Sequence, residues 1–312
     1  MYLSVLRAQF FLLSKLLTIG LQMTDSEILV TSLLGNSQKL DGGAMFGNAP
    51  KALWSRWAEP DELNRVPLAC RCALVETNGL KVLLETGIGA YLEPKLADRF
   101  GVVEKESILP KSLEEAGLTP DDIDFVILSH LHFDHAGGLL TTYEEGREPD
   151  LIFKNAKFVV GKEAFERSKN PHPRDRASFI SGLSDLLESS GRLIVLNEGE
   201  SIAELPQFEF FVSHGHTPGQ MHTIVHGETQ ELVYCGDLIP GTSWVHLPIT
   251  MGYDRFPEQL IEEKEALYMR AKEETLFFFT HDSEYAASTV EKNVKGRFEP
   301  ARKVKVLDRH AL

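Results

Sequence analysis

The sequence predicts a layered α/β domain with its β-sheets in the middle. Short apolar strands occur in two groups along the chain, and helical segments alternate with them, as expected where helices cover sheets. The 312 residues contain 43% apolar and 25% charged side chains, which excludes a disordered chain and a coiled coil. No internal repeat or long linker divides the chain, so one continuous domain is predicted over residues 23–312.

The first group of strands opens with a predicted hairpin. Leu68–Glu76 and Leu80–Glu85 are apolar runs on either side of Asn78-Gly79, a dipeptide that supplies the positive φ angles of a two-residue turn. Further on, the short apolar run Asp124–Ser129 predicts a buried strand. Helical periodicity occurs between them in two segments, Glu93–Phe100 and Pro110–Ala116.

The second half begins with a helical segment, Lys162–Ser189. Its helix is expected to break at Asn170-Pro171-His172-Pro173, because proline cannot continue a helix, and a surface excursion is predicted there. Strands and one long helix then alternate. The predicted segments are the strands Leu193–Leu196, Phe208–Ser213, His222–His226 and Glu231–Cys235, the helix Pro257–Lys272 and the strand Thr275–Thr280.

Residues 1–22 are predicted to be a leader helix, or an extension upstream of a start at Met23. Lys15 interrupts the apolar residues that follow Arg7, and no small-residue cleavage site comes after them. The uncharged stretches are much shorter than the roughly 20 residues of a spanning helix. A weak anchor at a membrane surface is the alternative interpretation.

Charge and cysteine content restrict the partners and the compartment. The net charge of −14, with no basic stripe, argues against nucleic acid and anionic lipid as partners. The three cysteines, Cys70, Cys72 and Cys235, form no CxxC pair, so neither a disulfide framework nor a thiolate zinc site is predicted. A reducing compartment, the cytoplasm, is therefore expected.

The strongest chemical signal directly follows the strand predicted at Asp124–Ser129. His130-Leu131-His132-Phe133-Asp134-His135 places three imidazoles and one carboxylate within a short loop, and such groups need partners when they are buried. A surface loop would explain a lone histidine, but three more candidate ligands lie near the ends of later strands: His216, Asp237 and His281. His130 and His132 point the same way in an extended loop, whereas Asp134 and His135 can turn toward a second position. The pattern therefore predicts a site for two metal ions.

These residues resemble the metallo-β-lactamase superfamily, whose signature HxHxDH, followed by His, Asp and His, is matched in order. The resemblance extends from about Glu27 to Val304. It includes Glu85-Thr86-Gly87, which is similar to the superfamily's Asp-Thr-Gly strand end with Glu in place of Asp. It implies a four-layer αββα sandwich, the metallo-β-lactamase fold, with the metals at one edge.

The resemblance also implies roles for the candidate ligands. His130, His132 and His216 would hold one ion. Asp134, His135 and His281 would hold the other, and Asp237 would bridge the two. Nitrogen and oxygen ligands without thiolate suit two Zn²⁺ ions, with Mn²⁺, Co²⁺ or Fe as alternatives. Three further histidines are interpreted as surface groups or as supports behind the ligands: His214, His222 and His226.

A closer resemblance is to the branch that contains quorum-quenching N-acyl-homoserine lactonases of the YtnP type and methyl parathion hydrolase. It rests on Leu40-Asp41-Gly42-Gly43-Ala44-Met45-Phe46-Gly47 and on Asp237-Leu238-Ile239-Pro240. The resemblance implies a hydrolase that opens lactones or related esters with a hydroxide bridging the two ions, and Asp134 is the candidate catalytic proton shuttle. Many such lactonases have a tyrosine three residues after the bridging aspartate, where this chain has Pro240.

The predicted partner is a small ester or lactone bound in an apolar pocket. No nucleic-acid partner and no stable membrane insertion are expected. The sequence does not determine the oligomeric state, and a homodimer is one alternative. The candidate lining residues, for each of which ordinary core packing is the alternative, are Met45, Phe46, Trp54, Trp57, Trp244, His246, Met251 and Tyr253. Alternative functions on the same scaffold are a thioester hydrolase of the glyoxalase II kind, a mononuclear iron persulfide dioxygenase and a metal-binding protein without catalysis.

Overall fold

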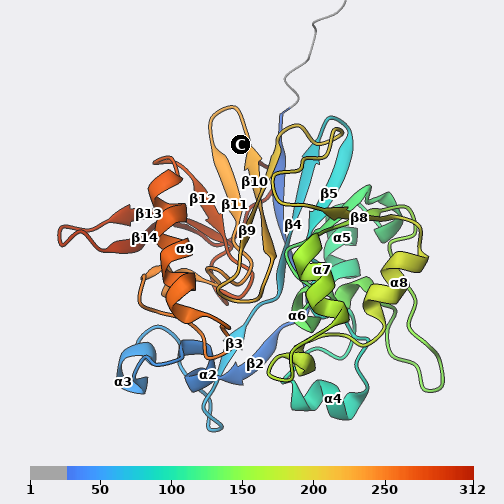
Figure 1. Cartoon of the computed structure of the whole chain (residues 1–312), viewed down its shortest axis with the longest axis horizontal. Coiled ribbons are helices and arrows are strands. Elements are labelled where there is room, and N and C mark those ends of the chain that lie inside the picture. The colour runs from blue at the N-terminus through green and yellow to red at the C-terminus, as the bar shows by residue number, and fades with distance from the viewer. Residues whose placement is uncertain (1–26) are drawn as a thin grey trace, which may run out of the picture.

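Two β-sheets pack face to face in the middle of the molecule, and helices cover their outer faces (Figure 1). A computed structural model describes residues 27–312, so the prediction for residues 1–22 lies outside the described part. Within residues 27–312, no helix is both long and apolar enough to cross a membrane.

The first sheet has seven strands in the order β15-β1-β4-β5-β6-β7-β8. The predicted hairpin forms between β4 and β5, and Asn78 and Gly79 have the expected positive φ angles of 51° and 78°. From β5 to β8 neighbouring strands are parallel. The strands are β1 (Leu29–Leu34), β4 (Arg71–Thr77), β5 (Leu80–Leu84), β6 (Phe125–Leu128), β7 (Lys157–Gly161), β8 (Leu193–Leu196) and β15 (His310–Ala311).

The second sheet has six strands in the order β14-β13-β12-β11-β10-β9. Its strands are antiparallel except for β11 and β12, which pair in parallel and are joined through α9 (Pro257–Arg270). The strand at Leu193–Leu196, which the sequence pattern groups with these, instead forms the edge of the first sheet. The bounds are β9 (Phe208–Ser213), β10 (Gln220–His226), β11 (Glu231–Tyr234), β12 (Leu276–Phe278), β13 (Ala287–Lys292) and β14 (Phe298–Val304).

Three apolar clusters hold the layers together. Val75 and Ile127 of the first sheet pack with Leu232 and Phe278 of the second, so one cluster lies between the sheets. A second cluster lies on the outer face of the first sheet, under α5 (Leu109–Glu115), α7 (Lys162–Lys169) and α8 (Leu183–Ser189). The third joins α9 to the outer face of the second sheet. The predicted four-layer αββα sandwich is therefore confirmed.

Short elements gather at one end of the sandwich, at the bottom of Figure 1. Among them is a two-stranded sheet of β2 and β3, which lies apart from the two large sheets. The elements at this end are β2 (Gln38–Asp41), β3 (Arg65–Leu68), α2 (Gly42–Phe46), α3 (Lys51–Trp54), α4 (Pro94–Arg99) and α6 (Phe133–Ala136). Four 3₁₀ turns complete the described elements: η1 (Pro120–Asp122), η2 (Gly137–Leu139), η3 (Arg176–Ser178) and η4 (Thr242–Val245).

The predicted break after Lys169 is also present. Helix α7 ends there, and the segment up to α8 contains only the turn η3. This segment runs beside the His-rich loop, because His132 and Phe179 form an isolated β-bridge. It therefore belongs to the end of the molecule where the candidate ligands lie.

Candidate metal centre

The His-rich loop lies at the carboxyl end of β6. His132 is extended, with φ −68° and ψ 153°, and α6 begins at the next residue, so the chain turns between His132 and His135. Glycine is required directly afterwards, because a Cβ on Gly138 would lie 2.0 Å from the carbonyl oxygen of Thr86. This close backbone approach keeps the loop against the end of β5.

The other three candidate ligands come from the second sheet. His216 follows β9, Asp237 follows β11, and His281 follows β12. Because the two sheets face each other, these strand ends meet the end of β6 across the sandwich. All seven predicted ligands are buried in this one place.

The first predicted set consists of His130, His132 and His216, with Asp237 beside them. One nitrogen or oxygen atom of each lies within 4.8 Å of the others. His216 Nε2 is 3.3 Å from His132 Nδ1 and 3.1 Å from Asp237 Oδ2. This spacing lets the four side chains hold one metal ion.

The second predicted set consists of Asp134, His135 and His281, whose ligand atoms also lie within 4.8 Å of one another. The Nε2 atoms of His135 and His281 are 3.3 Å apart. Asp237 Oδ1 is 3.3 Å from His135 Nε2 and 3.1 Å from His281 Nε2. The two oxygens of Asp237 therefore face the two sets, as a bridging carboxylate requires.

The hydrogen bonds within the cluster leave a buried ring nitrogen without a partner, which a metal ion could bind. His130 Nε2 is buried and has no hydrogen-bond partner among residues 27–312. A buried imidazole nitrogen without a partner is costly, and a divalent cation is a partner that it can bind. The cluster is therefore a metal-binding centre with nitrogen and oxygen donors.

The ligand histidines fall into two groups by the direction in which their pKa is shifted. Burial lowers the pKa of His130 and of His132 well below the ordinary value, so both rings are neutral and have lone pairs to donate. Burial also opposes protonation of His135 and His281, but the Asp237 carboxylate outweighs it and raises the pKa of each well above the ordinary value. Without a metal ion, a proton on these rings balances the charge of Asp237.

Groups behind the rings orient the ligands. His281 Nδ1 donates to the Ala69 carbonyl oxygen at 2.7 Å, and His216 Nδ1 donates to Asp254 Oδ1 at 2.9 Å. Glu85, at the end of β5, accepts from the Ser129 backbone N–H at 2.8 Å and lies 3.6 Å from His135 Nδ1. With Nδ1 occupied, the Nε2 atoms of His216 and His281 turn toward the centre.

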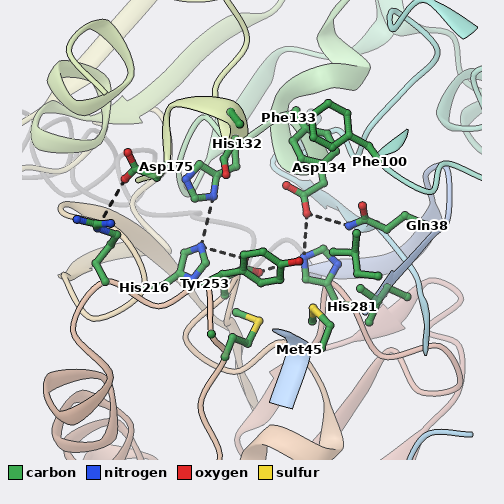
Figure 2. Close-up of a pocket in the computed structure, with 18 of the residues that line it drawn as sticks. Gln38, Met45, Phe100, His132, Phe133, Asp134, Asp175, His216, Tyr253 and His281 are labelled. Carbon is green, nitrogen blue, oxygen red and sulfur yellow. Dashed lines mark hydrogen bonds and ion pairs between the residues drawn. The ribbon is translucent and has the colours of Figure 1, made fainter. Parts of the chain in front are cut away.

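Gln38 is a further supporting residue that the sequence analysis does not predict. Its Nε2 donates to Asp134 Oδ2 at 3.0 Å, and both side chains lie at the same end of the site in Figure 2. Gln38 and Asp134 are 96 positions apart, so no local pattern connects them. Asp254 and its partner His216 are 38 positions apart, so no local pattern predicts their contact either.

A cavity of about 250 Å³ opens over the centre. Its floor includes His132, Asp134, His216, Asp237 and His281. Three of the predicted lining residues, Met45, Met251 and Tyr253, line it. The remaining apolar lining residues are Leu40, Leu68, Phe100, Phe133 and Ala177.

The other aromatic candidates do not line this cavity, which corrects the prediction for their contacts. Phe46 is stacked on Trp54 at 5.3 Å and on Trp244 at 4.7 Å, and all three rings are buried in the core. Trp244 Nε1 donates to the Met45 carbonyl oxygen at 2.9 Å, so this stack supports the wall from behind. His246 stacks on Trp57 at 5.3 Å, and both line, with Trp244, a neighbouring cavity that also reaches Leu68 and His281.

The histidines not assigned as ligands lie outside both sets. His222 is buried and hydrogen-bonded to the Ser213 hydroxyl at 2.7 Å, and His226 lies between Glu209 and Glu231. His214 Nδ1 accepts from the Gly219 backbone N–H at 3.2 Å. The sequence predicts these three as surface groups or as supports behind the ligands, and none of them belongs to a candidate ligand group among the described residues.

Comparison with known proteins identifies the family. The sequence pattern of the metallo-beta-lactamase superfamily matches residues 65–281. The chain belongs to this superfamily. Among curated proteins, the N-acyl homoserine lactonase of Bacillus thuringiensis is 25% identical over 246 residues, covering 73% of this chain and 86% of the lactonase.

Two other matches are partial. Ribonuclease TTHA0252 of Thermus thermophilus is 31% identical over 122 residues, which is 27% of its own length. The N-acyl homoserine lactonase of Bacillus cereus is 26% identical, and the chain spans 63% of it. The chain thus spans less than two thirds of either protein.

Solved structures agree on the fold. A probable metal-dependent hydrolase from Staphylococcus aureus is 31% identical and has a TM-score of 0.77, with 93% of this chain and 100% of that chain covered. AidC, a dizinc quorum-quenching lactonase, is 20% identical with a TM-score of 0.67, covering 88% and 94% of the two chains. These findings confirm the predicted superfamily and fold and support the predicted hydrolase class.

Proposed function

We propose that this chain is a metal-dependent hydrolase that opens lactones or cleaves related small esters. The observation that carries this proposal is the bridging position of Asp237 between two ligand sets, on the floor of a cavity whose walls are largely apolar. The lactonase relatives support the substrate class. Zn²⁺ is the proposed metal, because tetrahedral nitrogen and oxygen sites suit it.

The two ligand sets would each hold one divalent ion. Bound there, the ions would supply an activated water at neutral pH and would polarise the ester carbonyl. The chain has no need of a serine or cysteine nucleophile for this chemistry. Its own contribution is to hold the reacting groups in position and to move one proton.

Asp134 is the proposed proton carrier. Its carboxylate lies at the centre, where Gln38 Nε2 holds Oδ2 by a hydrogen bond of 3.0 Å. A carboxylate in that position can accept a proton from the attacking water and deliver it to the leaving oxygen. The hydrogen bond from Gln38 restricts rotation of the carboxylate and thereby fixes the direction of transfer.

Tyr253 is the proposed hydrogen-bond donor to the substrate. Its side chain lines the cavity. It could supply the phenol that Pro240, at the position of the tyrosine in many lactonases, does not provide. Burial, followed by the charge of Asp134, raises the pKa of Tyr253, so the hydroxyl keeps its proton and can donate to an ester oxygen. Met45 and Met251 beside it would contact an acyl chain.

The test combines metal analysis with a substrate screen. Zinc-loaded protein is assayed on homoserine lactones of increasing acyl length, an aryl ester, a phosphotriester and a glutathione thioester. We expect about two ions per chain and lactone or ester cleavage that tolerates different chain lengths, because an apolar wall discriminates by only ~1–3 kcal/mol per methylene. A single iron per chain, or cleavage restricted to the thioester, would contradict the proposal.

A further inference from the structure

One side of the cavity carries positive charge that the proposed reaction does not use. Among the described residues, the charged side chains that line the cavity, apart from the predicted ligands, are Arg174, Asp175 and Arg255. Asp175 lies at the end of the site marked by His132 and His216, away from Gln38 (Figure 2). The backbone N–H of Arg255 donates to the His216 carbonyl oxygen at 3.1 Å, so this wall adjoins the first ligand set directly.

The single carboxylate in this wall does not neutralise the arginines around it. Asp175 Oδ2 accepts from Arg167 Nη2 at 2.6 Å and from Arg167 Nε at 3.1 Å. Arg255 Nε lies farther away, at 3.8 Å. One carboxylate therefore faces two guanidinium groups, and Arg174 adds a third positive charge beside them.

Arg255 also lacks hydrogen-bond acceptors. Its side chain is only 12% exposed, and its Nε and Nη1 atoms are buried without a hydrogen-bond partner among residues 27–312, as is Asp175 Oδ1. Its Nη2 lies 3.4 Å from His172 Nδ1, which already accepts from the Arg174 backbone N–H. A guanidinium presents five donors, so a buried one with so few acceptors is costly unless a further anion approaches it.

Arg174 is positioned to share such an anion. Its Nη2 donates to the Gly252 carbonyl oxygen at 3.1 Å, which ties the guanidinium to the loop that carries Tyr253 and Arg255. The rest of its side chain is exposed at the cavity. Planar guanidinium groups recognise carboxylates better than ammonium groups do, because the two shapes match.

We propose that Arg174 and Arg255 form a subsite for a carboxylate that the substrate carries at a distance from its scissile ester. This inference rests on the proposed hydrolase function and narrows its substrate class to lactones or esters with an acidic substituent. The apolar wall at Met45 and Met251 would contact the chain between the two groups. The charge of the substrate, and not only its length, then determines selectivity.

The test uses two esters of equal chain length. The 4-nitrophenyl monoester of adipic acid carries a terminal carboxylate, and 4-nitrophenyl hexanoate does not. With zinc-loaded protein, we expect kcat/KM to be about tenfold to a hundredfold higher for the adipate monoester, since a hydrogen bond to a charged group contributes about 1.5–3 kcal/mol. The difference should lie mainly in KM and should shrink as salt is added.

Three variants complete the test. In Arg174→Gln and in Arg255→Met, the ratio of the two kcat/KM values should fall toward one. Arg176→Gln is the matched control, because Arg176 is exposed in the same segment but does not line the cavity, and it should keep the wild-type ratio. If Arg255→Met does not fold, Arg174→Gln decides alone, because that residue is exposed. A wild-type ratio near one, or an unchanged ratio in the arginine variants, would overturn the subsite.

Failure of the hydrolase proposal gives a different result. If neither ester is cleaved, the proposed function is wrong. Titration calorimetry of the zinc-loaded protein with adipate and with hexanoate then still tests whether the carboxylate subsite exists. Adipate should then bind at least about tenfold more tightly than hexanoate to the wild type but not to Arg174→Gln. Equal binding of the two acids to the wild type would overturn the subsite independently of turnover.

Discussion

At the scale of single residues, the direction of each imidazole depends on the atom behind it. The Ala69 carbonyl oxygen and the Asp254 carboxylate can only accept hydrogen bonds, so His281 and His216 place their protons on Nδ1. The other ring nitrogen of each faces Asp237, and it is the atom left to bind a metal ion. These supporting groups therefore determine metal affinity although they are not ligands.

The first prediction concerns Asp254. It accepts from His216 Nδ1 through one oxygen and from the Met251 backbone N–H through the other, at 2.6 Å. Asp254→Asn removes one acceptor, so one of these donors loses its partner. We expect zinc affinity to fall about tenfold to a hundredfold, as measured by competition with a chelator. His214→Gln, which changes a histidine outside both ligand sets, should leave the affinity unchanged; a normal affinity in Asp254→Asn would exclude this role.

The second prediction separates the two aspartates of the centre. Asp237→Ala should lose metal, because its two oxygens face both ligand sets. Asp134→Asn should retain much of the metal but lose most of kcat, by about 10²–10⁴-fold, because an amide cannot carry the proton. Elemental analysis and steady-state kinetics on the same preparations check both effects. Near-normal turnover of Asp134→Asn would show that the proton takes another route.

The third prediction concerns Tyr253. Tyr253→Phe removes only the hydroxyl, and the side chain is 43% exposed, so the fold should be unaffected. We expect kcat/KM for a lactone to fall about tenfold, the cost of losing one hydrogen bond to the substrate. Tyr143→Phe is the matched control, since Tyr143 is 41% exposed and does not line the cavity. Equal losses in the two variants, or none in either, would argue against a donor role.

At the scale of elements, the strands with strong local signals were predicted and the others were not. Asn78-Gly79 specifies the β4–β5 hairpin without tertiary information, whereas β14 contains Pro300 and lies at a sheet edge, where proline is tolerated. The short strands β2 and β3 pair with each other, and Gln38 of β2 forms an isolated bridge with Val102. Their four-residue lengths show no periodicity, so their structure depends on contacts that the sequence pattern does not contain.

The same distinction applies to the site. Strand ends and a compact His-rich loop allow the seven ligands to be predicted, because the local pattern carries the chemistry. The contacts of Gln38, Asp254 and Arg255 depend instead on how separate segments pack at one end of the sandwich. The sequence pattern places Phe46, Trp54 and Trp244 in the pocket wall, whereas their rings stack on one another in the core. The pattern cannot separate the two cases, because aromatic residues of a core and of a pocket look alike in sequence.

The fourth prediction concerns the buried lysine of α9. Lys264 Nζ donates to the carbonyl oxygens of Trp244, His246 and Ile249 at 3.0, 3.3 and 2.7 Å, which holds the loop before Met251 against the helix. Lys264→Met should lower the free energy of unfolding by about 2–4 kcal/mol near neutral pH, since these buried carbonyls lose their donor.

The pH dependence of that effect follows from the lysine's protonation. Burial lowers the pKa of Lys264 to about 7, so between that value and the ordinary 10.5 the unfolded chain binds a proton that the folded protein does not. Stability of the wild type relative to Lys264→Met should therefore rise with pH over this range, by up to about 1.4 kcal/mol per pH unit. Urea unfolding of both proteins at pH 7, 8 and 9 measures the difference, and a constant value would refute the prediction.

At the scale of the whole molecule, the centre joins the two sheets. His130, His132, Asp134 and His135 follow a strand of the first sheet, whereas His216, Asp237 and His281 follow strands of the second. Metal ions held by both groups would act as cross-links at one end of the sandwich. Farther from the centre, the apolar cluster between the sheets holds the two sheets together.

The last prediction is that metal removal loosens the sandwich as well as stopping turnover. The native fold assembles both ligand sets and the unfolded chain does not, so metal binding should stabilise the folded protein by about 4 kcal/mol when free metal exceeds Kd a thousandfold. For a chain of this size that corresponds to about 6 °C in Tm. Scanning calorimetry with and without a chelator measures the shift, and added Zn²⁺ should restore both Tm and turnover. Asp237→Ala is the control: its Tm should be nearly independent of the chelator. Equal Tm values for wild-type protein with and without metal would show that the sheets are held together without the ions.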